Sequence, residues 1–124
     1  MGPLLIVDDE FGLADSLRDL LRDEGYQTVV AFNGREALVR MEERTPALVL
    51  LDYMMPSMNG LELLEVMKRE ERWSGIPVIM MSAAPASFWK SLPCAGFLPK
   101  PFKLVQVVAL VHQLVGPPPP PAAR

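Results

Sequence analysis

The chain has 124 residues, half of them apolar and 22% charged, and its formal net charge is −3. This length and composition favour one globular domain and exclude a disordered chain. Without a Lys/Arg-rich run, direct binding to nucleic acid is not expected. The single cysteine, Cys94, excludes an internal disulfide framework and fits a reducing compartment. No apolar stretch approaches the ~18 residues of a membrane span, so we expect a cytoplasmic protein without membrane contact.

Short apolar runs alternate with amphipathic stretches, which is typical of a parallel sheet covered by helices. In the first half we predict, in chain order, a strand at 4–7, a helix at 11–24, a strand at 27–32, a helix at 35–44 and a strand at 47–51. Gly25 stands just past the first helix, where glycine commonly ends helices. The run 47–51 is apolar without alternation, so we predict that this strand is buried on both faces at the sheet centre.

The second half continues the pattern with one weak segment. We predict a loop at 55–60, a helix that buries Leu61, Leu64 and Met67, a strand at 77–81, a strand at 96–99 and a helix at 102–115. Pro85 and Pro93 bracket the segment before the last strand, which leaves room for only one or two helical turns. Residues 1–115 are therefore predicted to form the domain, and the proline-rich residues 116–124 a flexible tail or linker.

Polar side chains follow four of the predicted strands. Asp8 and Asp9 come after the first strand, Asp52 after the third, Ser82 after the fourth and Lys100 after the fifth. Because functional residues of a parallel sheet collect outside the carboxyl ends of its strands, we expect these side chains to meet. Clustered carboxylates repel one another unless a cation lies among them, and hard oxygen ligands suit Mg²⁺.

The remaining groups indicate which reaction the metal assists. A carboxylate at the tip of a central strand can act as a nucleophile and hold a covalent phosphoryl group. Mg²⁺, the Lys100 ammonium and the Ser82 hydroxyl can together neutralise and position phosphoryl oxygens around Asp52. We therefore interpret the cluster as a phosphate-receiving site.

Four motifs in the expected order closely resemble the receiver domains of two-component response regulators, which are CheY-like. The resemblance runs from about Leu4 to Val115. Its motifs are Ile6-Val7-Asp8-Asp9-Glu10, Leu50-Leu51-Asp52-Tyr53-Met54-Met55-Pro56-Ser57-Met58-Asn59-Gly60, Met81-Ser82-Ala83 and Leu98-Pro99-Lys100-Pro101-Phe102. This resemblance implies an α/β fold of the flavodoxin-like (βα)₅ type, with strand order 2-1-3-4-5.

The resemblance also implies the roles of the site residues. It makes Asp52 the phosphoacceptor, with a sensor histidine kinase or a phosphotransfer protein as donor. It implies that Mg²⁺ (or Mn²⁺) is ligated directly by Asp9 and Asp52, through water by Asp8, and by the backbone carbonyl of Met54. Ser82 is then expected to hydrogen-bond the new phosphoryl group, and Lys100 to pair with it.

A conformational switch is the expected consequence of phosphorylation. The added charge of about −1.5 to −2 would draw Ser82 toward it, and Phe97 would turn into the space vacated. The resemblance further implies a cis peptide bond before Pro101. Phe97 stands where the family more often has tyrosine. The segment between Ser82 and Lys100 is shorter than is usual in the family, so we expect a shortened or irregular fourth helix.

Other functions are open at this point. The main alternative is a receiver-like interaction module that binds partners without being phosphorylated. A small phosphatase with an aspartyl nucleophile is disfavoured because Met54 stands where such enzymes place a second acid, so we expect a signalling domain and not an enzyme. Phe88 and Trp89 are interpreted as packing residues rather than as an exposed patch for partners.

Overall fold

Residues 1–120 are described by the structure, a computed structural model. Its centre is a five-stranded parallel sheet with the order β2-β1-β3-β4-β5, so the predicted strand order is confirmed. The strands are β1 (Leu4–Val7), β2 (Thr28–Ala31), β3 (Leu48–Asp52), β4 (Val78–Ser82) and β5 (Gly96–Pro99). All four pairings are parallel, which aligns the carboxyl ends of the strands along one edge of the sheet.

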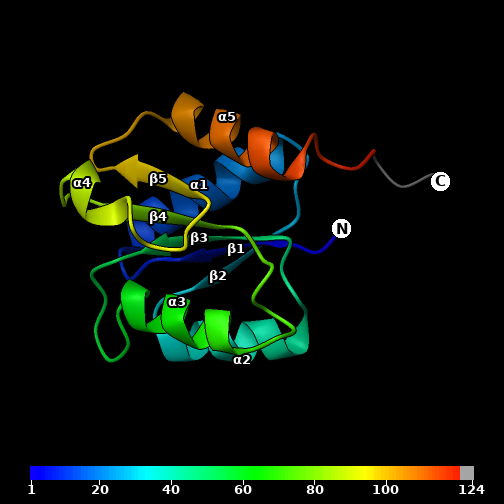
Figure 1. Cartoon of the computed structure of the whole chain (residues 1–124). Helices are drawn as coiled ribbons and strands as arrows, with labels where there is room; N and C mark the ends of the chain where they lie inside the picture. Colours follow the sequence, from blue (N-terminus) through cyan, green and yellow to red (C-terminus); the bar gives the residue numbers. More distant parts are fainter. Residues whose placement is uncertain (121–124) are drawn as a thin grey trace.

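Helices cover both faces of this sheet (Figure 1). On one face lie α1 (Phe11–Asp23) and α5 (Leu104–Val115), and on the other α2 (Gly34–Glu43) and α3 (Gly60–Arg69). The short α4 (Ala86–Trp89) lies beside β5 at the end of the strands where the arrowheads point. The N-terminus and the end of α5 lie at the opposite end of the sheet, so neither lies at the edge that carries the predicted site.

Alternation along the two central strands divides the core into two halves. Every residue of β1 and β3 is buried, as predicted for strands covered on both faces. Because successive side chains point to opposite faces, Leu5, Val7, Val49 and Leu51 pack with α2 and α3, whereas Leu4, Ile6, Leu48 and Leu50 pack with α1 and α5. Burial on both faces fixes the position of Asp52 at the tip of β3.

Local capping explains why two helices begin away from the predicted residue. The side chain of Asn33 accepts a hydrogen bond from the backbone N–H of Glu36, so α2 begins at Gly34 and not at Arg35. The last helix begins at Leu104, two residues later than predicted. Its preceding backbone N–H, that of Lys103, is satisfied by the side chain of Gln106.

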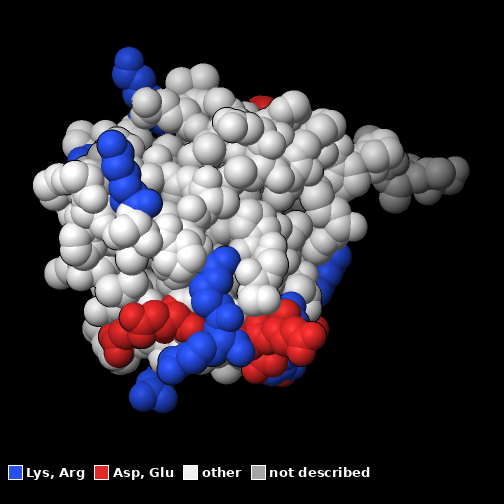
Figure 2. Space-filling model, in the orientation of Figure 1, with Lys and Arg blue, Asp and Glu red and all other residues white. Residues whose placement is uncertain are grey.

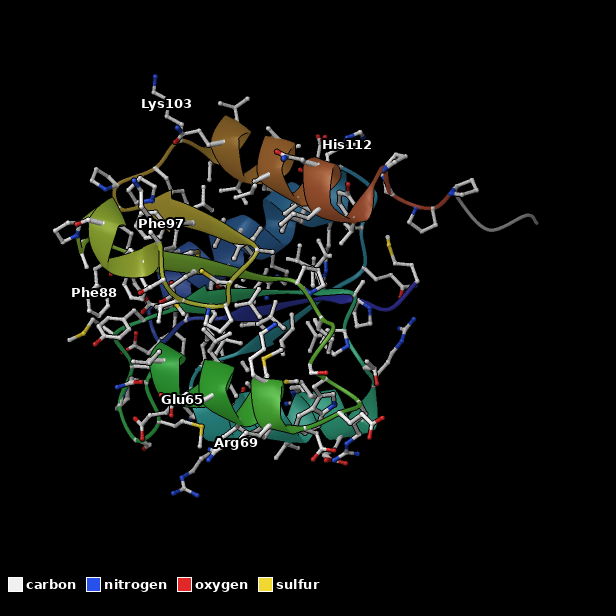
Figure 3. All side chains as sticks on the ribbon, viewed as in Figure 1. Glu65, Arg69, Phe88, Phe97, Lys103 and His112 are labelled. Carbon is white, nitrogen blue, oxygen red and sulfur yellow. The ribbon has the colours of Figure 1, made fainter. Side chains whose placement is uncertain are left out.

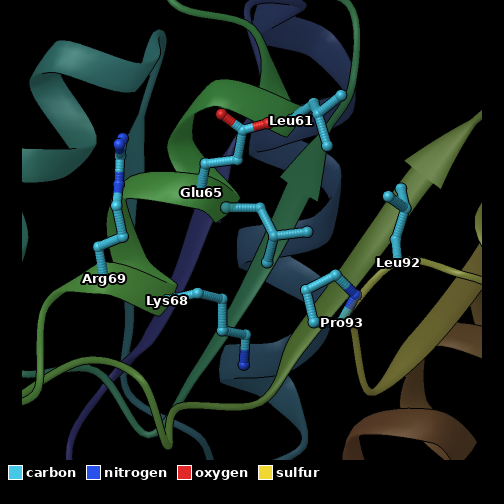
Figure 4. Close-up of a pocket in the computed structure, with 7 residues that line it drawn as sticks. Leu61, Glu65, Lys68, Arg69, Leu92 and Pro93 are labelled. Carbon is cyan, nitrogen blue, oxygen red and sulfur yellow. The ribbon is translucent and has the colours of Figure 1, made fainter.

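The fourth helix is a single turn, as expected from its flanking prolines. Beside it, an apolar groove of about 370 Å³ opens between α3 and residues 92–93 (Figure 4). Leu61, predicted to be buried, is instead half-buried on the wall of this groove. The one-turn α4 leaves this part of α3 without a helical neighbour, which accounts for the difference.

Charged side chains are unevenly distributed over the face seen in Figure 2. They gather over the α2 and α3 layer, whereas the side formed by α4, β5 and α5 is largely uncharged. Within residues 1–120, no helix has the length and apolar character needed to cross a membrane. The first residues after α5 lie against the end of α1, where the Tyr26 hydroxyl donates a hydrogen bond of 2.7 Å to the Gly116 carbonyl.

Candidate functional site

Three aspartates meet where β1 and β3 end. Val7 and Leu51 are paired in the sheet, so the residues that follow them, Asp8 and Asp52, leave neighbouring strands side by side. One carboxylate oxygen from each of Asp8, Asp9 and Asp52 lies within 4.8 Å of the other two. Asp8 is 0% and Asp52 5% exposed, whereas Asp9 faces solvent. The predicted acidic cluster is thus present, with two of its members inside the protein.

Lys100 reaches the same cluster from the end of β5. Its backbone N–H donates a hydrogen bond of 2.8 Å to the Ser82 carbonyl, and the Lys100–Pro101 peptide bond is cis, as the resemblance implies. Its Nζ lies 3.0 Å from Asp52 Oδ1 and 3.5 Å from Asp8 Oδ2. One ammonium group therefore bridges the two buried carboxylates.

The other predicted residues lie at different depths around the cluster. Ser82 ends β4 in a buried position, and its Oγ accepts a hydrogen bond of 3.0 Å from the Ala84 N–H. The side chain of Met54, two residues past Asp52, is 70% exposed. Phe97 lies on β5 (Figure 3), half-buried and stacked on Trp89 with ring centroids 5.7 Å apart. Phe97 therefore belongs to the aromatic packing under α4 and not to the acidic cluster.

Burial dominates the electrostatics of the two inner carboxylates. Loss of solvation, followed by the negative charge of Asp8, raises the pKa of Asp52 from 3.8 to about 6, although Lys100 opposes the shift. Burial also raises the pKa of Asp8, against the backbone N–H of Glu10 and the charge of Lys100. Burial lowers the pKa of Lys100, but its hydrogen bond to Asp52 and both negative charges outweigh this and raise it overall. The ionised cluster is thus short of positive charge.

A divalent cation fits this arrangement. Within residues 1–120, Lys100 is the one cation at ion-pair distance from the three carboxylates, whose oxygens are close enough to bind one ion together. Mg²⁺ favours hard oxygen ligands and keeps some of its waters, which the exposed side of Asp9 would leave room for. The donor chemistry of the site therefore suits the metal that the sequence predicts.

The Asp52→Asn variant is expected to be more stable than the parent by about 2 kcal/mol at pH 7 without metal, because it removes a poorly solvated charge. The folded state holds its Asp52 proton up to about pH 6, whereas the unfolded chain releases it near 3.8. Parent stability from this group is thus complete below about pH 4 and lost as the pH rises through 6. Urea unfolding of parent and variant in EDTA, at pH 7 and at pH 4, measures the difference in their free energy of unfolding.

At pH 4 the two proteins should unfold at similar urea concentrations, because Asp52 is largely protonated in the folded parent. A variant that is less stable than the parent at pH 7 would show that the Asp52–Lys100 ion pair outweighs the cost of burial.

Two contacts that position the site were not predicted from the sequence. The Glu10 N–H donates a hydrogen bond of 2.9 Å to Asp8 Oδ1 and fixes that carboxylate. Gly60 lies so close to β3 that a Cβ atom there would lie 2.5 Å from the Asp52 carbonyl oxygen. The glycine of the motif Asn59-Gly60 could have indicated the second contact, because glycine is typical of places where two backbones approach closely.

Comparison with known proteins agrees with this geometry. The sequence matches the family described as response regulator receiver domain over residues 4–112. The DNA-binding response regulator MtrA of Mycobacterium tuberculosis (strain ATCC 25618 / H37Rv) is 38% identical over 113 residues, covering 88% of this chain and 48% of the relative. The response regulator Rre1 of Synechocystis sp. (strain ATCC 27184 / PCC 6803 / Kazusa) is 32% identical over 117 residues, which is 90% of this chain and 51% of the relative. The chain thus spans about half the length of these curated relatives.

Solved structures show the same fold. The receiver domain of a signal transduction histidine kinase from Syntrophus aciditrophicus superposes with a TM-score of 0.84 at 34% identity, covering 93% of this chain and 90% of that one. Chemotaxis response regulator CheY4 of Vibrio cholerae gives a TM-score of 0.85 at 24% identity, with 92% and 98% coverage, and supports the fold alone. With the family match covering most of its length, the chain belongs to the response regulator receiver domain family.

Proposed function

We propose that this chain accepts a phosphoryl group on Asp52, in a Mg²⁺-dependent reaction, and transmits the signal by a change of conformation. The donor would be a sensor histidine kinase or a phosphotransfer protein. The observation that carries the proposal is the position of Asp52, which lies in the three-carboxylate cluster with Lys100 Nζ 3.0 Å from its Oδ1. Membership of the receiver family supports the same assignment.

The reaction joins one carboxylate oxygen of Asp52 to phosphorus. The P–N bond to the donor histidine breaks and its electron pair stays on that ring nitrogen. The other ring nitrogen of the donor carries a proton, so the histidine leaves as a neutral imidazole. Lys100, which bridges Asp52 and Asp8, would pair with the phosphoryl oxygens, and the Ser82 hydroxyl would donate a hydrogen bond to them. Asp8, Asp9, Asp52 and the Met54 carbonyl would hold Mg²⁺ (or Mn²⁺), which supplies positive charge to the same oxygens.

The switch would start at Ser82 and end at Phe97. Ser82 is buried at the end of β4, and β4 and β5 are paired so that Met80 lies opposite Phe97. Movement of Ser82 toward the phosphoryl group would therefore disturb the strand pair that carries Phe97. We propose that this change alters the α4 and β5 side of the domain.

The donor protein would approach over a groove beside Lys100. This groove has a volume of about 420 Å³ and runs between the start of α1 and the residues after β4 and β5. Its walls are Glu10, Leu13, Ala83, Lys100, Pro101 and Phe102. The apolar walls would bind the protein that carries the phosphohistidine, and the Lys100 ammonium would pair with the negatively charged phosphoryl group.

The remaining assignments are also proposals. Residues 1–115 would form the receiver domain, and residues 116–124, of which 121–124 lie outside the described part, would be a tail or linker. We propose a cytoplasmic signalling role for the chain, without turnover of free phosphate esters and without contacts of its own to nucleic acid or membrane.

Intact-mass measurement after incubation with acetyl phosphate tests the proposal. With Mg²⁺ the protein should gain the mass of one phosphoryl group, and with EDTA it should gain none, because the carboxylate cluster needs a cation to accept further negative charge. An unchanged mass in Mg²⁺, in protein that remains folded, would contradict the proposal and favour an interaction module that works without phosphorylation.

The phosphoryl group on Asp52 should be lost slowly, and Met54→Asn should accelerate its loss several-fold. Met54 and Ala84 lie two residues past Asp52 and Ser82, and neither side chain can orient a water molecule for attack. Because the Met54 side chain is 70% exposed, the substitution should not perturb folding. The decay of phosphorylated mass after removal of acetyl phosphate measures both rates. Equal rates in parent and variant would contradict this expectation.

A further inference from the structure

Trp89 connects the phosphoacceptor strand to β5. Its ring centroid lies 5.0 Å from that of Tyr53, the residue directly after Asp52, and 5.7 Å from that of Phe97 on β5. The ring centroid of Phe88, also on α4, lies 4.7 Å from that of Trp89. Phe88 is 48% exposed, whereas Trp89 is 2% exposed. The prediction that both aromatics pack is thus confirmed for Trp89, whereas Phe88 packs edge-on against Trp89 and Tyr53 and remains about half exposed. Neither Tyr53 nor Phe97 can move far without moving the indole between them.

The indole of Trp89 lacks a hydrogen-bond partner. Among the buried side-chain nitrogen and oxygen atoms of residues 1–120, its Nε1 is the one that makes no hydrogen bond. Buried indole N–H groups usually find an acceptor, and a donor left without one disfavours the conformation that buries it. Any rearrangement that gives this N–H an acceptor is therefore favoured by the removal of that penalty.

A second connection leads from the site to α4. Ser82 Oγ accepts a hydrogen bond from the Ala84 N–H, and Pro85, the next residue, immediately precedes α4. The helix itself is one turn, and the Phe88 N–H closes it on the Pro85 carbonyl. A displacement of the Ser82 hydroxyl toward a phosphoryl group would move the Ala84 amide or break this bond. Either event shifts the short segment that holds Trp89.

We propose that Trp89 is the positioning residue through which phosphorylation of Asp52 is coupled to β5. Its N–H, unpaired in the unphosphorylated protein, gains an acceptor in the phosphorylated one and so favours the switched conformation. The inference rests on the proposed function, since it needs a phosphoryl group or its mimic at Asp52. By thermodynamic reciprocity, a residue that favours the switched state also strengthens binding of the mimic that selects it.

NMR of the ¹⁵N-labelled parent tests the state of the indole directly. Beryllofluoride with Mg²⁺ serves as the phosphoryl mimic, and the loss of a signal in Trp89→Phe assigns the Trp89 indole resonance. We expect this proton resonance to move downfield on addition of the mimic, as a newly formed hydrogen bond requires. The resonance of Trp73 should stay in place, because this residue precedes the start of β4, whereas α4 follows its end, and the Trp73 ring lies under the Arg72 guanidinium. An unmoved Trp89 resonance in protein that binds the mimic would overturn the inference.

Affinity for the mimic provides the second readout. Trp89→Phe keeps an aromatic ring but lacks the donor, so beryllofluoride should bind several-fold more weakly, whereas Trp73→Phe should bind it like the parent. Equal affinity of Trp89→Phe and the parent would also overturn the inference.

Failure of the two proposals is distinguishable: a parent that neither binds beryllofluoride nor gains mass from acetyl phosphate refutes the proposed function. A parent that is phosphorylated but whose Trp89 indole resonance does not move on addition of beryllofluoride refutes the coupling alone. If Trp89→Phe fails to fold, the signal lost in Trp73→Phe identifies the Trp73 resonance and leaves the other to Trp89, whose response in the parent still decides.

Discussion

The Asp52→Asn variant is expected to gain no phosphoryl group when it is incubated with acetyl phosphate and Mg²⁺. An amide oxygen is a far weaker nucleophile than a carboxylate, and the new bond to phosphorus would not form. The neighbouring carboxylates do not replace it, because the Asp8 side chain is completely buried and Asp9 leaves the strand end toward solvent. Intact mass over the time in which the parent is fully modified measures this loss.

Asp15→Asn is the matched control for this experiment, because Asp15 is an exposed acid on α1 that pairs with Arg18 on the same helix. It should be phosphorylated like the parent. Modification of Asp52→Asn at the rate of the parent would place the phosphoacceptor elsewhere in the chain.

Replacement of Lys100 by alanine is expected to slow phosphorylation of Asp52 by about a hundredfold, which is typical of removing one hydrogen-bond donor that stabilises charge in a transition state. Lys100 Nζ lies 3.0 Å from Asp52 Oδ1, and we expect it to stabilise the phosphoryl oxygens during transfer. The rate of mass gain with acetyl phosphate at saturating Mg²⁺ measures the effect, because saturation separates the loss of rate from any change in metal affinity.

Lys103→Ala is the control for Lys100→Ala. Lys103 lies three residues further along the same segment and projects away from the molecule (Figure 3), so its removal should leave the rate unchanged. If Lys100→Ala were phosphorylated as fast as the parent, the lysine would serve only to stabilise the folded carboxylate cluster.

The central place of the third strand and the meeting of the acids could be predicted from the residue pattern, whereas the full strand order was implied by the resemblance to receiver domains. The unbroken apolar run before Asp52 indicated a strand buried on both faces, and such a strand lies at the centre of a parallel sheet. The carboxyl ends of parallel strands share one edge, so residues as distant as Asp8 and Lys100 were expected to meet there, and they lie 3.5 Å apart. The predictions from the residue pattern depend on the kind and burial of each element, which hydrophobic periodicity indicates.

The rest depends on side-chain packing, which periodicity does not specify. The sequence does not reveal that Lys100 bridges two carboxylates, because its rotamer is set by the cluster itself. It also gave the same interpretation to Phe88 and Trp89, although one is exposed and the other buried. On a one-turn helix the face that each side chain presents depends on the flanking backbone, so adjacent aromatics can differ in burial, here 48% against 2% exposed.

The most direct test of the central claim is to locate the phosphoryl group in the chain. Protein treated with acetyl phosphate and Mg²⁺ is reduced with borohydride, which converts an aspartyl phosphate to homoserine, and its peptides are sequenced by tandem mass spectrometry. We expect homoserine at position 52, only in the sample that contained Mg²⁺. Homoserine at another aspartate, or equal conversion of Asp52 in EDTA, would contradict the central claim.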